Sequence, residues 1–273
     1  MIRFFFLLLL MGVVSLSARG DDILFIGNSF TFGDTAPVVK KNGGVPKLVE
    51  AIALAEGKRL STFAVTAGGQ NWSYHLAQPA TGKALGSKAW NWVVLQDYST
   101  RPTDAGDVKQ FMLDGETFSE RIAATSPKAG ILLFETWGRP PGDFYHTKPG
   151  NVFSGPEQMM DEVHRSYATL RDDLAAKNPG RPVRVALVGT AFAQVRAQYP
   201  EIIIDAPDKH HATGLGYYLA ALVIYDTMDP GGSVHDAPTQ FFNGAFTVPP
   251  DVAAKLEKVA GEVAMSQMLK LKG

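Results

Sequence analysis

The chain has no cysteine among its 273 residues. This excludes disulfide scaffolds and thiolate chemistry, although an oxidising compartment is tolerated. The chain also has almost no excess of charge of either sign, because 26 basic residues nearly balance 27 acidic ones. That balance argues against nucleic acid or an anionic membrane surface as a partner. The sequence also has no dinucleotide fingerprint, phosphate-binding glycine loop or metal-ligand spacing, so we expect neither cofactor nor metal.

Long apolar runs are missing after the first twenty residues. Arg3 precedes an apolar run over 4–14. Small residues that a signal peptidase accepts follow this run: Ser15, Ser17, Ala18 and Gly20. The pattern predicts a secretory signal peptide over 1–20 and one domain over 21–273, in a secreted or periplasmic protein. An uncleaved anchor helix is the alternative, but a membrane span needs about 20 apolar residues, so we expect no stable membrane insertion after cleavage. Loss of the leader, with two arginines and no acids, shifts the formal charge from −1 to −3.

Short apolar runs alternate with helical patterns along the remaining chain. The expected strands cover 23–26, 59–66, 92–95, 130–134 and 184–188. The expected helices cover 46–56, 108–124, 156–176, 213–228 and 251–270. This order predicts β-α-β units and a three-layer α/β/α sandwich with a mostly parallel five-stranded sheet. Residues 138–155 and 229–250 are expected to be long loops, which are either substrate-contacting segments or plain insertions.

The first expected strand ends abruptly in Gly27-Asn28-Ser29. In open α/β sheets, ligands bind at the carboxyl edge of the strands. A serine exposed on a strand-to-helix turn at that edge is a candidate nucleophile. The alternative is that Ser29 only caps the helix or stabilises the turn.

A second candidate segment precedes the helix expected at 213–228. Asp208 and His211 are three residues apart, so one short turn can bring the carboxylate to the imidazole. A carboxylate in that place fixes the tautomer of the base, and a base is what a serine hydroxyl needs to attack at neutral pH. His210 competes with His211 for the role of base, and Asp205 competes with Asp208 for the role of acid. The alternative is a polar turn that caps the helix.

The order of these segments resembles the SGNH (GDSL-like) hydrolase superfamily, in its carbohydrate-esterase-like branch. The residues that carry the resemblance are Gly27-Asn28-Ser29-Phe30-Thr31, Gly68-Gly69, Leu95-Gln96-Asp97-Tyr98-Ser99, and Asp208 with His211. The resemblance implies a flavodoxin-like fold with Ser29 as nucleophile, His211 as base and Asp208 as its orienting acid. It also implies an oxyanion hole of the Ser29 N–H, the Gly69 N–H (with Gly68 as runner-up) and a side chain of the third segment.

Two departures from the family pattern affect the expected site. Asn28 stands where the family name implies aspartate, a replacement that keeps the turn. The third segment lacks the usual Gly-x-Asn-Asp, and Gln96 is the best substitute for the missing oxyanion donor, with a purely structural role as the equal alternative. Asn28, His75 and Trp137 are candidates to line the substrate, although His75 and Trp137 could equally pack inside the protein.

The resulting expectation is a secreted serine ester hydrolase that works through an acyl-enzyme and needs no cofactor. Its expected substrate is a small-molecule or polysaccharide ester, first of all the O-acetyl or other short acyl groups of carbohydrates. The alternatives are a lipase, arylesterase or thioesterase for short acyl chains, and a non-catalytic carbohydrate-binding protein that retains the fold.

Overall fold

The computed structural model describes residues 20–147, 150, 152–228 and 237–270, with side chains as far as residue 266. The signal-peptide prediction therefore lies almost entirely outside the described residues. The main sheet consists of β1 (Asp21–Gly27), β2 (Leu60–Thr66), β3 (Trp92–Leu95), β4 (Gly130–Phe134) and β5 (Val183–Ala186). Its order is β2-β1-β3-β4-β5, and all four strand pairs are parallel. The predicted α/β fold with a parallel five-stranded sheet is confirmed.

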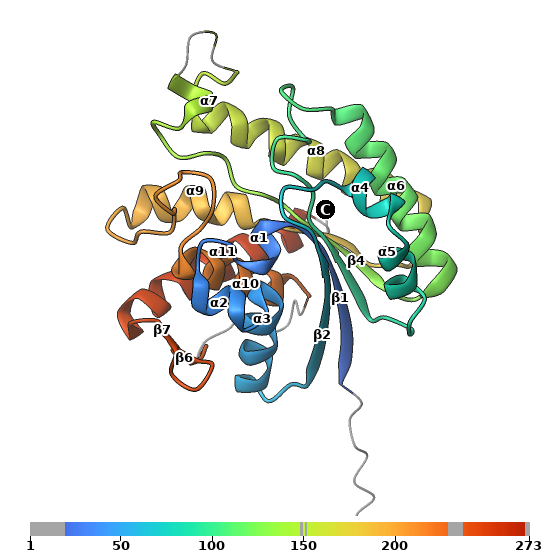
Figure 1. The fold of residues 1–273 in the computed structure, drawn as a ribbon, viewed down its shortest axis with the longest axis horizontal. Helices are drawn as coiled ribbons and strands as arrows, with labels where there is room; N and C mark the ends of the chain where they lie inside the picture. The colour runs from blue at the N-terminus through green and yellow to red at the C-terminus, as the bar shows by residue number, and fades with distance from the viewer. Residues whose placement is uncertain (1–19, 148–149, 151, 229–236, 271–273) are drawn as a thin grey trace, which may run out of the picture.

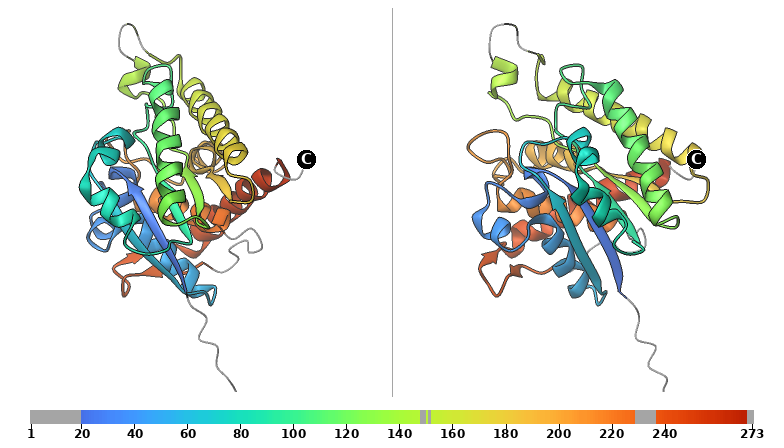
Figure 2. Two further views of the ribbon diagram at one scale, coloured as in Figure 1. Left: turned by 90° about the vertical axis from the view of Figure 1, so that its right-hand side faces the viewer. Right: turned by 45° about the vertical axis from the view of Figure 1, so that its right-hand side comes forward.

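Helices cover both faces of this sheet (Figures 1 and 2). One layer contains α3 (Gly44–Ala55), α9 (Val188–Gln198), α10 (Gly214–Met228) and α11 (Pro250–Lys270). The other contains α4 (Trp72–Ala77), α5 (Pro79–Leu85), α6 (Val108–Thr125) and α8 (Pro156–Lys177). α10 is the central helix of its layer, since it packs against β5, α3, α9 and α11 and buries nearly every residue. The three layers enclose one continuous apolar core.

One substantial helix, α9, was not expected. It starts two residues after β5 ends, so the apolar residues of the two elements run together in the sequence. Its first turn is capped from a distance, because Glu135 Oε2 accepts from Thr190 N (2.9 Å) and Thr190 Oγ1 (3.0 Å). A carboxylate here accepts from an amide that has no partner within the helix. Its negative charge also interacts favourably with the positive amino-terminal end of the helix dipole.

The two expected long loops contain short elements. Residues 138–155 include α7 (Phe144–Thr147), and residues 237–250 include the antiparallel pair β6 (Gln240–Phe241) and β7 (Phe246–Thr247). The rest of the second loop, residues 229–236, lies outside the described residues, as do 148, 149 and 151. Two further short helices, α1 (Ser29–Phe32) and α2 (Pro37–Lys41), follow β1.

The strand order places a switch in chain direction between β1 and β3. From β1 the chain first adds β2 on one side, and it later returns to add β3 on the other. The loops that leave β1 and β3 therefore separate at their carboxyl ends, which is where open α/β sheets bind ligands. Ser29 follows β1 and Gln96 follows β3, so both lie at this switch point; Figure 1 shows α1 at the upper end of β1.

Candidate active site

Ser29 is the first residue of α1, directly after β1. Asn28 caps this short helix, because its Oδ1 accepts from Phe30 N (3.1 Å). The Nδ2 of Asn28 donates to Gln70 O (2.9 Å), which ties the serine turn to the segment after β2. An aspartate could not make this second bond, since a carboxylate only accepts. Both side chains are largely buried, at 2% exposure for Asn28 and 6% for Ser29, and the Asn28 side chain is the one whose hydrogen bonds shape the turn.

Gln96 holds the same turn from the β3 side. Its Oε1 accepts from Asn28 N (2.8 Å) and Thr31 Oγ1 (2.9 Å), and its Nε2 donates to Asp97 O. Gly27 makes room for it, because a Cβ there would lie 2.7 Å from Gln96 Oε1. The buried amide is thus committed at both ends to internal bonds. This arrangement favours the structural alternative for Gln96 over the role of oxyanion donor.

His75 stabilises the turn at Ser29 through a hydrogen bond to the last residue of β1. The side chain is buried, and its Nε2 donates to Gly27 O (2.9 Å) at the end of β1. Burial lowers the pKa of His75 in spite of this hydrogen bond, which keeps the ring uncharged at neutral pH. Of its two proposed roles, His75 therefore has the packing one and does not line the surface at Ser29.

Asp208 and His211 meet as their spacing predicts. The Asp208 Oδ2 lies 2.7 Å from His211 Nδ1, and Oδ1 accepts from the amides of His211 (2.9 Å) and His210 (3.0 Å). Burial opposes the charge on Asp208, but these hydrogen bonds outweigh it and lower the pKa of the carboxyl to about 2. The carboxylate is therefore ionised at neutral pH and holds the His211 ring with Nδ1 inward. Nε2 is then left to exchange protons with a neighbour.

The loop that carries Asp208 and His211, here called the base loop, is held against the serine turn, which is the turn at Asn28 and Ser29 with the loop that follows it. Thr35 Oγ1 donates to Ala212 O (2.7 Å), and the ring of Phe30 contacts the His211 ring edge-on at 5.6 Å between centroids. These contacts bring the base loop to the serine turn, although the two are about 180 residues apart in the sequence. Asp205, the rival acid, is held by Arg196 in a bidentate ion pair at 2.6 and 2.9 Å, which leaves Asp208 as the carboxylate on His211.

Two buried side chains from the end of β4 anchor the base loop. Trp137 Nε1 (3.2 Å) and Arg139 Nη1 (3.1 Å) both donate to His210 O. The Trp137 ring is stacked between Phe30 and Phe192, at 4.0 and 4.4 Å between centroids, and it is fully buried. Trp137 is thus a core residue that positions the loop, and it has no face left on which to stack a sugar.

Arg139 is a site residue to which the sequence assigned no role. It is fully buried, and its Nη2 donates to Ser99 Oγ (2.9 Å) while its Nη1 holds His210 O. Burial lowers the pKa of Arg139, yet the guanidinium keeps its charge at neutral pH. That charge, after the larger effect of burial, lowers the pKa of His210 to about 3. The His210 imidazole is therefore neutral, and only the neighbouring His211 has a carboxylate partner on its ring.

Backbone amides at the serine turn and after β2 are available as oxyanion donors. Within the described part of the chain, neither Ser29 N nor Gly69 N donates to another residue of the protein. Gly69 adopts a φ of +68°, a conformation that favours glycine, and no atom lies within 4 Å of where its Cβ would be. Gly68 is exposed beside it and packs near the Phe32 ring.

Asp97 connects the segments that follow β2 and β3. It is completely buried, and its Oδ1 accepts from Trp72 N (2.8 Å) and Tyr98 N (2.8 Å), while Oδ2 has no hydrogen-bond partner among the residues that the structure describes. Burial raises the pKa of Asp97 to about 7, against the opposing effect of these hydrogen bonds and of the Arg101 charge. A buried carboxyl at the foot of a candidate site is a frequent feature of functional sites, and here it fixes two loops to each other.

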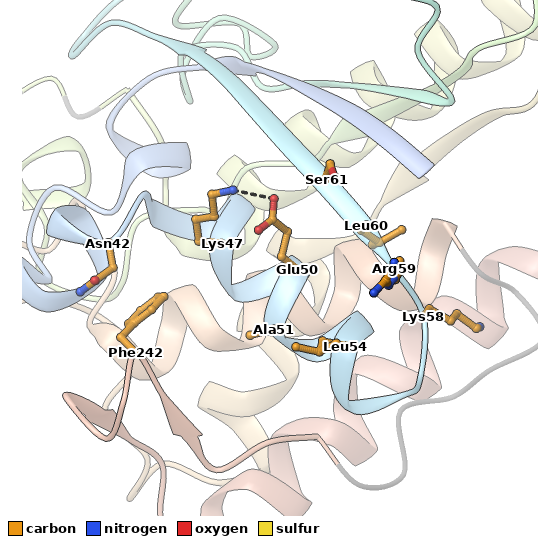
Figure 3. Close-up of a pocket in the computed structure, with 10 residues that line it drawn as sticks. All are labelled: Asn42, Lys47, Glu50, Ala51, Leu54, Lys58, Arg59, Leu60, Ser61 and Phe242. Atoms are coloured by element: carbon orange, nitrogen blue, oxygen red, sulfur yellow. Dashed lines mark hydrogen bonds and ion pairs between the residues drawn. The ribbon is translucent and has the colours of Figure 1, made fainter. Parts of the chain in front are cut away.

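One cavity of the described part of the chain lies away from Ser29. Its volume is about 570 Å³, and it opens between α3, the amino-terminal end of β2 and the turn at Phe242 (Figure 3). Ser29 sits at the opposite, carboxyl end of the strands. Among the described residues, no cluster of three or more His, Asp or Glu side chains could hold a metal ion. No described helix combines the length and the apolar character that crossing a membrane would require.

Comparison with solved structures finds the same fold in proteins of low sequence identity, among them proteins named as esterases. A DUF4886 family protein from Bacteroides uniformis has a TM-score of 0.67 with 15% identity, over 90% of this chain and 95% of the other. A family 3 carbohydrate esterase from Clostridium thermocellum has a TM-score of 0.56 with 12% identity, over 78% and 97%. A variant of an acetyl xylan esterase from Geobacillus stearothermophilus has a TM-score of 0.53 with 17% identity, over 75% and 92%. No family model and no curated protein matches the chain by sequence.

Proposed function

We propose that this protein is a serine ester hydrolase in which Ser29 attacks the ester carbonyl. The hydrogen bond from His211 Nδ1 to Asp208, in a loop fastened to the serine turn, carries this proposal. His211 takes the Ser29 proton as the hydroxyl adds to the carbonyl, and it then gives this proton to the leaving alcohol. Water then attacks the acyl-enzyme. His211 takes a proton from this water and gives it to Ser29 Oγ as the carboxylic acid leaves. The amides of Ser29 and Gly69 stabilise the developing oxyanion, a contribution of about 3–4 kcal/mol for each donor.

The proposed substrates are O-acetyl or other short acyl esters of carbohydrates. Two proteins with this fold, at under 20% identity, carry the names of a carbohydrate esterase and an acetyl xylan esterase, which supports this substrate class by analogy. The proposed signal peptide over 1–20 would export the enzyme to where such polysaccharides occur.

Turnover of p-nitrophenyl acetate tests the reaction. Ser29→Ala should lower kcat/KM by several orders of magnitude while the protein still unfolds at the same temperature. Ser87→Ala is the matched control, because Ser87 is exposed and its hydroxyl only bonds Ala84 O within a turn. Equal activity of the Ser29 variant and the control would contradict the assignment. Acetylated xylo-oligosaccharides, compared with p-nitrophenyl esters of increasing chain length, would then test the substrate class.

A further inference from the structure

His210 lies beside the proposed base but is not used by the triad. The centroids of the His210 and His211 rings are 4.3 Å apart, with the ring planes at 70°. The His210 ring also meets Phe30 edge-on at 5.4 Å and Tyr98 at 6.5 Å. It is only partly buried, and within the described residues neither of its nitrogens has a hydrogen-bond partner. A polar ring with free nitrogens therefore stands at the surface next to the reacting groups.

The backbone of His210 is fixed at both ends. Its amide donates to Asp208, and its carbonyl accepts from the buried Trp137 and Arg139. These bonds hold the ring in place before any ligand arrives, which reduces the entropy lost on binding. Because they use main-chain atoms, the side chain can be exchanged without removing them.

Hydrolysis itself determines which half of the ester faces His210. The base returns its proton to the oxygen of the leaving alcohol, so that oxygen must lie at His211 Nε2. The oxyanion donors act on the carbonyl oxygen instead, on the side of Ser29 and Gly69. A group next to His211 therefore meets the alcohol half of the ester, and His210 is such a group.

The charge state of His210 matches a hydroxyl group. Burial and the Arg139 charge lower the pKa of His210 to about 3, so its imidazole is neutral at neutral pH. A neutral imidazole has one N–H donor and one acceptor nitrogen, whereas an imidazolium only donates. A hydroxyl both donates and accepts, so it can use either nitrogen, and an apolar alcohol can use neither.

We infer that the His210 imidazole binds the alcohol half of the substrate through a hydroxyl next to the acylated oxygen. This inference rests on the proposed esterase function and specifies its substrate class as partly acylated polyols, including sugars. His210 would thus set specificity, while His211 carries the proton.

Two esters that differ by one hydroxyl test the inference: trans-2-hydroxycyclohexyl acetate and cyclohexyl acetate. The measured quantity is the ratio of their kcat/KM values, in which a general loss of activity cancels. One neutral hydrogen bond predicts a preference of about three- to tenfold for the hydroxylated ester in the unmodified protein. His210→Phe should bring this ratio close to one, and His210→Asn or His210→Gln should retain part of it. Tyr98→Phe is the control, since it removes the neighbouring phenol hydroxyl and keeps the ring.

The outcomes separate this inference from the esterase proposal. An unchanged ratio in His210→Phe would overturn the inference, while Ser29-dependent hydrolysis of cyclohexyl acetate would still uphold the esterase. Loss of the ratio in Tyr98→Phe, with His210→Phe unaffected, would assign the hydroxyl to Tyr98 instead. If the unmodified protein hydrolyses p-nitrophenyl acetate through Ser29 but neither cyclohexyl ester, the inference is overturned and the esterase proposal stands. Absence of Ser29-dependent hydrolysis of all three esters would refute both.

Discussion

Replacing Asp97 with asparagine should change how the stability of the protein depends on pH. The Asn Oδ1 can accept from Trp72 N and Tyr98 N as the carboxylate does. The substitution removes the ionisation and puts an NH2 group in place of Oδ2, which has no hydrogen-bond partner among the described residues. Asp97→Asn is therefore a nearly isosteric test of the buried charge.

The expected size follows from the raised pKa of Asp97, which is about 7 in the folded protein against 3.8 for a free aspartate. Between these two pH values the unfolded chain has released the proton and the folded protein still holds it. The free energy of unfolding therefore falls as the pH rises through this interval, by on the order of 4 kcal/mol in total for this one group. The free energy of unfolding of the asparagine variant does not fall in this way, because asparagine does not ionise.

Urea unfolding at pH 4, 5, 6, 7 and 8 measures the effect. The stability of Asp97→Asn relative to the unmodified protein should increase steadily from pH 4 to pH 7 and level off above it. Asp173→Asn, at an exposed position of α8, is the control for a general change of charge. A stability difference that stays constant over this range would refute the buried, protonated state of Asp97.

Three further predictions concern the site and the amino terminus. His211→Ala should abolish ester turnover nearly as fully as loss of the nucleophile, whereas His210→Ala should be much milder, and the reverse order of the two kcat values would move the base by one residue. Gln96→Ala should lower the free energy of unfolding by about 1–3 kcal/mol, because it leaves Asn28 N without its acceptor, and an unchanged melting temperature with a much lower kcat would instead restore the oxyanion role. Sequencing of the exported protein should find its first residue between positions 18 and 21, and a chain that still begins with the initiator methionine would indicate an anchor.

Periodicity located the main elements of the fold to within a few residues, because strand and helix patterns differ and the apolar runs are short. It did not find α9, whose start depends on the distant carboxylate of Glu135 and whose apolar residues follow those of β5 without a break. It also did not find the small helices α1, α2, α4 and α5. The caps of α1 and α4 are Asn28 and Asn71, which read equally well as turn residues in the sequence, and α2 and α5 begin at a proline without a side-chain cap.

The local part of the site was predictable, and the long-range part was not. Asp208 and His211 are close in sequence, so their spacing suffices to predict that they meet. The roles of Gln96, Trp137 and Arg139 depend on contacts between segments 70 or so residues apart, which composition and spacing do not encode. For Gln96 the available signal was its place directly after a buried strand, and for Trp137 and Arg139 it was their place in the loop that follows β4. These positions marked the right edge of the sheet without specifying the partner.

Reaction with a fluorophosphonate, followed by mass spectrometry of the digested protein, tests the central claim most directly. The reagent phosphonylates an activated serine, and it does so only where a base removes the hydroxyl proton. The proposed triad predicts one adduct on the peptide that contains Ser29, absent in Ser29→Ala and strongly slowed in His211→Ala. An adduct at another residue, or undiminished labelling of Ser29→Ala, would contradict it.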